Sequence, residues 1–222
     1  MQPFHESQVI FEDNHLLVVN KLVGQLVQGD KTGDVCLADE VKSYLKEKYQ
    51  KPGNVFCGVI HRLDRPTSGL VVFAKTSKAL ERMNLQFQQR EPQKIYYALV
   101  EGALTGSGEL IQNLLKNESQ NKSYVVDASK GKRAVLRYEV CHKYTHYTLV
   151  KIALDTGRHH QIRCQMSHLG HPLKGDLKYG AKRANANQGI CLHSGELSFT
   201  HPVSHLRMEF SAAIPNDGNW IQ

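Results

Sequence analysis

The sequence predicts a mixed fold of strands and helices in a single domain of 222 residues. Side chains alternate along residues 134–140, and a second run follows at residues 147–154; together the two segments are typical of an antiparallel hairpin. In residues 37–45, by contrast, apolar side chains recur at helical spacing opposite a lysine-rich side. No linker or low-complexity tract divides the chain, so we expect residues 1–222 to form one domain without an accessory domain.

The first part of the chain is expected to begin with two short strands, residues 9–11 and 16–19, joined by a polar turn. Asp34 is expected to cap the helix that follows, and this helix ends before Pro52. Residues 70–74 are continuously apolar and therefore predict a buried strand.

A second helix is expected to begin at Thr76 or Ser77, and a strand at residues 94–102 follows it. Residues 105–131 are polar and are expected to be irregular apart from a short strand near their end. After the hairpin, residues 158–169 predict a short basic helix. The apolar contacts expected of the second helix are Leu80, Met83, Leu85 and Phe87. The closing strands are expected at residues 190–192, 196–199 and 206–210.

The composition favours an anionic partner. Lysine and arginine number 28 against 21 acidic residues, for a formal charge of +7. Nucleic acid is the commonest partner of a basic chain, although solvated lysines without a specific partner are an alternative. The five cysteines form no Cys-x-x-Cys pair, and the first residues contain neither a signal sequence nor an apolar span. We therefore expect a cytoplasmic protein with reduced thiols and no membrane segment.

A charged turn lies just before the apolar strand predicted at residues 70–74. In this turn Asp64 stands between Arg62 and Arg65, whose guanidinium groups favour the ionised carboxylate and could also meet a polyanion. A carboxylate held on a loop by a rigid strand is our candidate catalytic group. A surface cluster of ion pairs is the alternative, and the charge pattern alone gives the two about even weight.

Other familiar kinds of site fit the sequence less well. The chain has no Gly-x-x-x-x-Gly-Lys-Ser/Thr loop and no dinucleotide-binding glycine spacing. His159, His160, His168 and His171 are dense, but no cysteine or carboxylate joins them at a known ligand spacing. Ser68 lies outside any Gly-x-Ser-x-Gly turn. We therefore expect neither a cofactor nor a metal.

What remains is a lone carboxylate, a strand carrying Tyr96 and a basic helix, a combination that suits chemistry on RNA. A carboxylate can attack an anomeric carbon, as in retaining glycoside hydrolysis. Hydrolysis normally needs a second carboxylic acid, and the motif contains none. A reaction in which the leaving base is kept and reattached is therefore easier to reconcile with the sequence, and a nucleoside hydrolase is an alternative.

The motif His61-Arg-Leu-Asp-Arg-Pro-Thr-Ser-Gly-Leu70 closely resembles the signature of RluA-type RNA pseudouridine synthases. A second long motif, Thr156-Gly-Arg-x-His-Gln-Ile-Arg163, supports the resemblance. The shorter matches, in the family's order along the chain, are Phe11-Glu-Asp13 with Leu17-Val-Val-Asn-Lys21, Lys94-x-Tyr96-x-Ala98, Gly175-Asp-x-x-Tyr-Gly180, and Leu192-His193 with His201-Pro202. The resemblance therefore spans nearly the whole chain.

The resemblance implies isomerisation of uridine to pseudouridine in tRNA or rRNA, without cofactor or metal, on an α+β fold with a bisected, mainly antiparallel sheet. Asp64 would be the nucleophile, Tyr96 would stack on the base and help remove its C5 proton, and Arg163 would pair with Asp64. Arg62 would fill the gap that the flipped nucleotide leaves. Leu63 and Ile162 would line the pocket, and Arg65 and Arg158 would contact the phosphates.

Two departures from the family pattern put substrate choice in doubt. Leu22 stands where proline is usual, and His159 stands where threonine is usual. The residues before Val9 are too few for the small S4-type RNA-binding domain of some relatives, so we expect the catalytic domain itself to recognise the target. Nothing in the sequence calls for assembly, and we expect a monomer. A noncatalytic RNA-binding or RNA-folding protein on the same scaffold is the alternative class.

Overall fold

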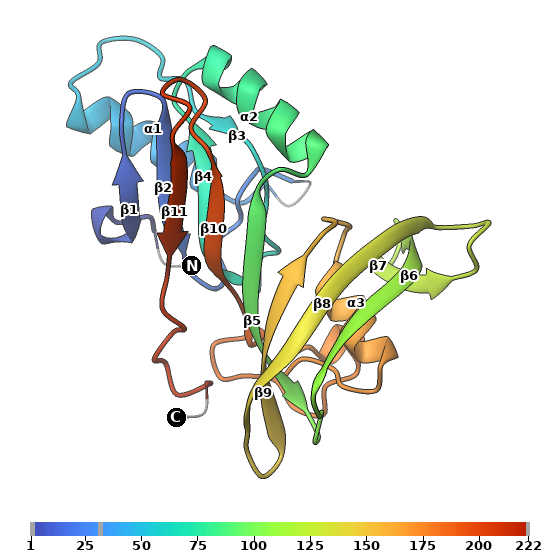
Figure 1. Ribbon diagram of the computed structural model, residues 1–222. Helices are drawn as coiled ribbons and strands as arrows, with labels where there is room; N and C mark the ends of the chain where they lie inside the picture. The colour runs from blue at the N-terminus through green and yellow to red at the C-terminus, as the bar shows by residue number, and fades with distance from the viewer. Residues whose placement is uncertain (1–2, 31–32, 221–222) are drawn as a thin grey trace. The chain divides into compact units, whose positions relative to one another are not determined.

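The computed structural model describes residues 3–30 and 33–220, which fold into two compact units (Figure 1). The first unit contains Met1–Pro92 and Glu196–Ala212, and the second contains Gln93–Gly195 and Ala213–Gln222. Antiparallel pairs of strands occur in each unit, and three α-helices accompany them in the described residues, so the predicted mixed fold is confirmed. No helix in this described part of the chain is long and apolar enough to cross a membrane.

The first unit is organised around the sheet order β1-β2-β4-β10, with β3 paired to β4 and β11 paired to β10. The predicted pair of strands near the N-terminus is confirmed, because β1 and β2 lie antiparallel. Every residue of β4 is buried, as its continuous apolar run predicts. The strands are β1 Val9–Glu12, β2 Leu16–Lys21, β3 Gly58–Val59, β4 Ser68–Ala74, β10 Leu192–Thr200 and β11 Arg207–Ser211; residues 196–200 of β10 belong to this unit.

Two helices, α1 Leu37–Lys48 and α2 Ser77–Gln89, belong to the first unit. Helix α2 packs Ala79 and Met83 against one face of β2 and β4, and Thr76 caps it by accepting a hydrogen bond from the amide of Ala79 at 3.2 Å, as predicted. The contact expected of Leu85 is wrong, because this side chain lies on the outer side of the helix and is 53% exposed.

The predicted cap of α1 is also wrong. The residue that precedes the helix is Cys36, whereas Asp34 accepts a hydrogen bond from Arg65 at 2.7 Å. The carboxylate of Asp34 forms an ion pair with Arg65, far along the chain, and therefore does not cap the helix as its neighbours in the sequence predict.

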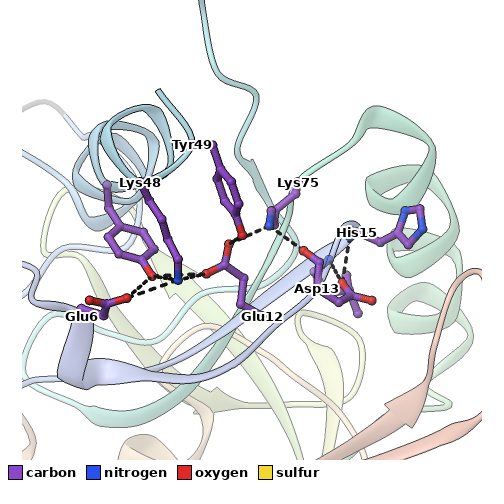
Figure 2. A network of polar contacts seen from close by, with 9 residues as sticks. Glu6, Glu12, Asp13, His15, Lys48, Tyr49 and Lys75 are labelled. Carbon is purple, nitrogen blue, oxygen red and sulfur yellow. Dashed lines mark hydrogen bonds and ion pairs between the residues drawn. The ribbon is translucent and has the colours of Figure 1, made fainter. Parts of the chain in front are cut away.

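A polar network around Glu12 joins β1, the end of α1 and the end of β4 (Figure 2). The carboxylate of Glu12 accepts hydrogen bonds from Lys75 Nζ at 2.7 Å, Tyr49 Oη at 2.7 Å and Lys48 Nζ at 2.9 Å. Burial alone would raise the pKa of Glu12, but these hydrogen bonds outweigh it and lower the pKa to about 2. Glu12 is therefore ionised at neutral pH and holds three separate segments together.

The second unit has the strand order β5-β9-β8-β6-β7. The predicted hairpin is confirmed as β8 and β9, which pair antiparallel. Helix α3, Gln161–His168, packs Cys164 against Leu114 of β6 and Ala134 of β8. The elements are β5 Gln93–Glu101, β6 Ser107–Asn117, β7 Lys122–Val126, β8 Lys132–Lys143, β9 Tyr147–Leu154 and the 3-10 turn η2 Leu177–Tyr179.

Three expectations for this region need correction. Residues 105–131 are not irregular, since β6 is a long strand that pairs with β8 from Ser107↔Glu139 to Leu114↔Lys132. Backbone pairing with β8 makes this strand, and its own polar sequence does not reveal it. The strands expected at 190–192 and 196–199 are one strand, β10, and the helix expected over 158–169 is shorter at both ends.

Candidate active site

Asp64 lies on the loop that leads into β4 of the first unit. Its side chain is half-buried, Leu63 beside it is buried, and Arg62 is exposed. The loop closes in a tight turn, because the amide of Thr67 donates to the carbonyl oxygen of Asp64 at 3.0 Å. The turn chemistry expected here is thus confirmed, and it fixes the backbone from which the carboxylate projects.

Lys21, at the end of β2, holds this loop from inside the first unit. Its side chain is fully buried, and its ammonium donates to the carbonyl oxygens of Leu22 at 2.9 Å, Arg65 at 3.2 Å and Thr67 at 2.6 Å. Burial lowers the pKa of Lys21 to about 7, and this effect outweighs the charge of Asp64, which acts in the opposite direction. Two of the three acceptors, the carbonyls of Arg65 and Thr67, come just after Asp64 in the chain, so the lysine positions the turn that follows the carboxylate.

Arg65 is held on the other side of the same loop. Its guanidinium donates to the carboxylate of Asp34 at 2.7 Å and to the carbonyl oxygen of Gly24 at 3.2 Å, and its own carbonyl accepts from the amide of Gly24 at 2.9 Å. These contacts tie the Asp64 loop to the segment that follows β2. Arg65 therefore supports the loop whatever else its charge does.

Tyr96 lies on β5 in the second unit, opposite Ile152 of β9. Its side chain is 7% exposed, whereas the neighbouring Tyr97 faces the other side of the strand, where Lys151 Nζ lies 5.8 Å from the centre of its ring. Because successive side chains of a strand point to opposite faces, Tyr96 lies on the more buried side and Tyr97 on the other.

Arg163, on α3, forms a buried ion pair with Asp176. Its Nε and Nη2 donate to the two carboxylate oxygens at 2.7 and 2.9 Å, and its Cζ lies 5.1 Å from the centre of the Tyr179 ring. The fork of two hydrogen bonds and the ring fix the plane of the guanidinium. Asp176 and Tyr179 both lie in the short motif at residues 175–180, and the sequence alone predicts no role for them. The pairing that it expected between Arg163 and Asp64 stays a prediction.

The start of α3 is organised by Gln161. Its side-chain oxygen accepts from the hydroxyl of Thr156 at 2.8 Å and from the amide of Arg158 at 3.0 Å, while its amide group donates to the carbonyl of Val135 at 3.0 Å. The Arg158 guanidinium donates to a backbone carbonyl on β8, and Ile162 is buried. The motif at residues 156–163 thus forms one hydrogen-bonded segment that presents Arg163.

The structure therefore groups the predicted site residues by unit. Arg62, Leu63, Asp64 and Arg65 lie on one loop of the first unit together with Lys21, which the sequence analysis had not selected. The predicted residues of the second unit are Tyr96 on β5 and Arg158, Ile162 and Arg163 at the start of α3. The lysine could have been found from its place in the motif at residues 17–21, but no charge pattern shows that it is buried.

The chain belongs to the RNA pseudouridylate synthase family, whose model matches residues 15–168. It is therefore an isomerase that converts uridine in RNA to pseudouridine, and the predicted activity is confirmed.

The relatives place the chain in the RluA type that the sequence resembles. The dual-specificity RNA pseudouridine synthase RluA of Haemophilus influenzae is 39% identical over 208 residues, which cover 92% of this chain and 91% of that protein. The ribosomal large subunit pseudouridine synthase D of Zymomonas mobilis is 35% identical over 221 residues, 95% of this chain and 70% of that protein.

Solved structures confirm the pseudouridine synthase fold. The human RNA pseudouridylate synthase domain containing 4 shares 20% identity and superimposes with a TM-score of 0.79, over 95% of this chain and 89% of that one. At this identity the likeness concerns the fold alone.

Proposed function

We propose that Asp64 is the nucleophile of the isomerisation and that the substrate is a structured tRNA or ribosomal RNA. The observation that carries the proposal is a half-buried carboxylate on a loop held from inside by Lys21, in a chain of the RNA pseudouridylate synthase family. One of the two relatives described above is named for dual specificity towards RNA and the other for the large ribosomal subunit, which supports ribosomal RNA as one class of substrate.

In this proposal the target nucleotide is first flipped out of the RNA, at a cost of a few kcal/mol. The carboxylate of Asp64 then attacks C1′, the N1–C1′ bond breaks, and the uracil leaves as an anion that stays in the pocket. The base rotates, C5 forms a bond to C1′ and the carboxylate is released. The C5 proton is lost and N1 gains a proton, so no atom is added or removed overall.

The remaining predicted residues have separate roles in the same reaction. Tyr96 is proposed to stack on the uracil and to help remove its C5 proton, because its ring is buried and rigidly held on β5. Arg163 supplies a counter-charge for Asp64, and its bidentate pair with Asp176 fixes the guanidinium for that task.

The substrate contacts in the proposal come from both charged and apolar side chains. The exposed Arg62 occupies the gap that the flipped nucleotide leaves, and the buried Leu63 and Ile162 line the pocket that keeps the free uracil from water. Arg65 and Arg158 contribute positive charge near the RNA backbone.

Asp64→Asn tests the nucleophile. This change keeps the shape of the side chain but removes its charge, so we expect loss of tritium release from RNA labelled at uridine C5 with nearly unchanged RNA binding. Asp39→Asn, on the surface of α1, is the matched control and is expected to keep full activity. Tritium release by Asp64→Asn at the rate of the control would overturn the assignment.

The class of RNA is tested separately. Total tRNA and ribosomal RNA, each tritiated at uridine C5 and prepared from cells lacking this enzyme, are offered to the wild-type protein. Release from either RNA supports the proposal, and release from neither, with activity on another RNA of those cells, contradicts it.

A further inference from the structure

The outer edge of β7 is bound by side chains from α3 and η2. All three polar groups of Ser123 take part: its amide donates to Tyr179 Oη at 2.8 Å, its carbonyl accepts from Cys164 Sγ at 3.2 Å, and its hydroxyl donates to the carbonyl of His159 at 2.8 Å. An edge strand normally exposes such groups. Here they attach the β6–β7 hairpin to the segment that carries Arg163.

The ring of His159 adds contacts to both sides of this attachment. Its Nδ1 lies 2.9 Å from Ser123 Oγ, and its Nε2 lies 3.1 Å from Asn121 Oδ1, at the turn between β6 and β7. Asn121 has a φ of 46°, so the turn holds a left-handed residue where the histidine meets it. We name the group of His159, Ser123 and Asn121 the hairpin clasp.

Counting protons identifies the form of His159 that satisfies the hairpin clasp. The hydroxyl of Ser123 has one proton, and it is used for the carbonyl of His159, so Nδ1 must donate to Oγ. The oxygen of Asn121 can only accept, so Nε2 must donate as well. With the oxygen of the Asn121 amide facing Nε2, the doubly protonated imidazolium is the form that satisfies both contacts.

The hairpin clasp is connected to the proposed catalytic arginine. The ring of His159 stacks on that of His160 with 3.8 Å between centroids, and His160 Nδ1 lies 3.0 Å from Tyr179 Oη. The Tyr179 ring in turn lies over the guanidinium of Arg163. A movement of the hairpin would therefore be transmitted towards Arg163 through the stacked rings of His159 and His160 and the hydrogen bond between His160 and Tyr179.

We propose that His159 is a positioning residue which, as an imidazolium, holds the β6–β7 hairpin to the start of α3 and so sets the affinity for the RNA substrate. The inference rests on the proposed function for the role of Arg163, but the attachment of the hairpin itself does not depend on that role.

The charges around the ring act in both directions. Glu118, on the same turn, favours the imidazolium and is itself paired with Lys116. Lys122 on β7 and Lys178 on η2, whose Nζ donates to the carbonyls of Gln120 and Asn121, disfavour it. His160 stacks on the ring of His159, and Tyr179 packs against His160. An RNA phosphate near these lysines would shift the balance towards the charged form, so RNA binding and protonation of His159 are expected to favour each other.

His159→Gln and His159→Thr test the inference, the latter introducing the threonine usual in the resembled motif. With RNA tritiated at uridine C5 and prepared from cells lacking this enzyme, we expect KM to rise about tenfold, as for loss of a hydrogen bond to a charged group, with kcat within about twofold. The wild-type KM should rise between pH 6 and pH 8, and the KM of both variants should not. His168→Gln, on the exposed last residue of α3, is the control.

Hydrogen exchange without RNA tests the attachment independently of the catalytic roles. The amides of residues 118–124 should exchange faster in both variants, and in Ser123→Ala, than in wild type or His168→Gln. Unchanged exchange, or a KM and pH profile equal to those of His168→Gln, would overturn the proposal. If Asp64→Asn were active while these effects persisted, the proposed nucleophile would fail and the role of His159 would stand.

Discussion

Replacing Lys21 with methionine tests whether a buried charge positions the candidate nucleophile. The ammonium donates to the carbonyls of Arg65 and Thr67, just after Asp64, so its removal takes this donor from both carbonyls and frees the loop. Because a misplacement of about 1 Å can lower a rate by about 10²-fold, we expect a loss of this order in kcat. Lys46→Met, on the exposed end of α1, is the matched control.

The same substitution has a signature in stability. Lys21 has a pKa of about 7 in the folded protein, against 10.5 for an exposed lysine. Between these values the unfolded chain binds more protons than the folded one, so stability rises with pH. From pH 7 to pH 9 the rise due to Lys21 is about 2 kcal/mol. The methionine variant lacks this pH-dependent rise, so the stability difference between wild type and variant should grow by about 2 kcal/mol from pH 7 to pH 9.

Urea unfolding of both proteins at pH 7 and pH 9 measures this difference. Other groups that titrate in this range are common to both proteins and cancel in the comparison. A stability difference that does not change between the two pH values would show that Lys21 has an ordinary pKa. Full activity of the methionine variant would refute its role in positioning Asp64.

Three further predictions concern other contacts. Arg163→Ala should lose activity and about 3–5 kcal/mol of stability, because Asp176 is left buried and unpaired; urea unfolding and tritium release measure the two effects, and unchanged turnover would contradict the proposed role. Glu12→Gln should lower the free energy of unfolding by about 2 kcal/mol at pH 7, since the pKa of Glu12 is about 2 in the folded protein. The difference in unfolding free energy between wild type and variant should narrow as pH falls from about 4.5 towards 2. Urea midpoints of the two proteins that keep a constant separation over that range would contradict this prediction. Tyr96→Phe keeps the stacking ring but loses the hydroxyl, so single-turnover tritium release should slow by about 10²-fold with little change in RNA binding, and an equal rate would exclude the hydroxyl from proton removal.

The sequence predicted those elements whose own residues determine their structure. The continuous apolar run that forms β4 and the capping threonine of α2 depend on neighbours in the chain, and both are confirmed. Strand β6 was missed because its polar residues become a strand only by pairing with β8. The misassigned cap, Asp34, shows the same limit, since its partner Arg65 lies 31 residues away.

For the candidate site, motifs identified residues but not their partners. Lys21 and Asp176 both stood within matched motifs, yet nothing in a linear pattern distinguishes a fully buried lysine or aspartate from an exposed one. The acceptors of Lys21 come from residues 65 and 67, more than forty positions along the chain. Long-range backbone geometry therefore decides which charged residues support the reaction.

The two buried cations differ in how their charge is balanced, and this difference has a consequence for pH. Arg163 meets a carboxylate in a bidentate pair, so its position does not change over the physiological range. Lys21 donates hydrogen bonds to three backbone carbonyls and interacts with the charge of Asp64, and its pKa of about 7 means that it loses its proton just above neutrality. The contribution of Lys21 to stability should then rise with pH while the loop that bears Asp64 loses this ionic interaction. We therefore expect activity to fall between pH 7 and pH 9, over the range in which the contribution of Lys21 to stability increases. An activity that rises over this range would show that the protonation of Lys21 does not control the position of Asp64.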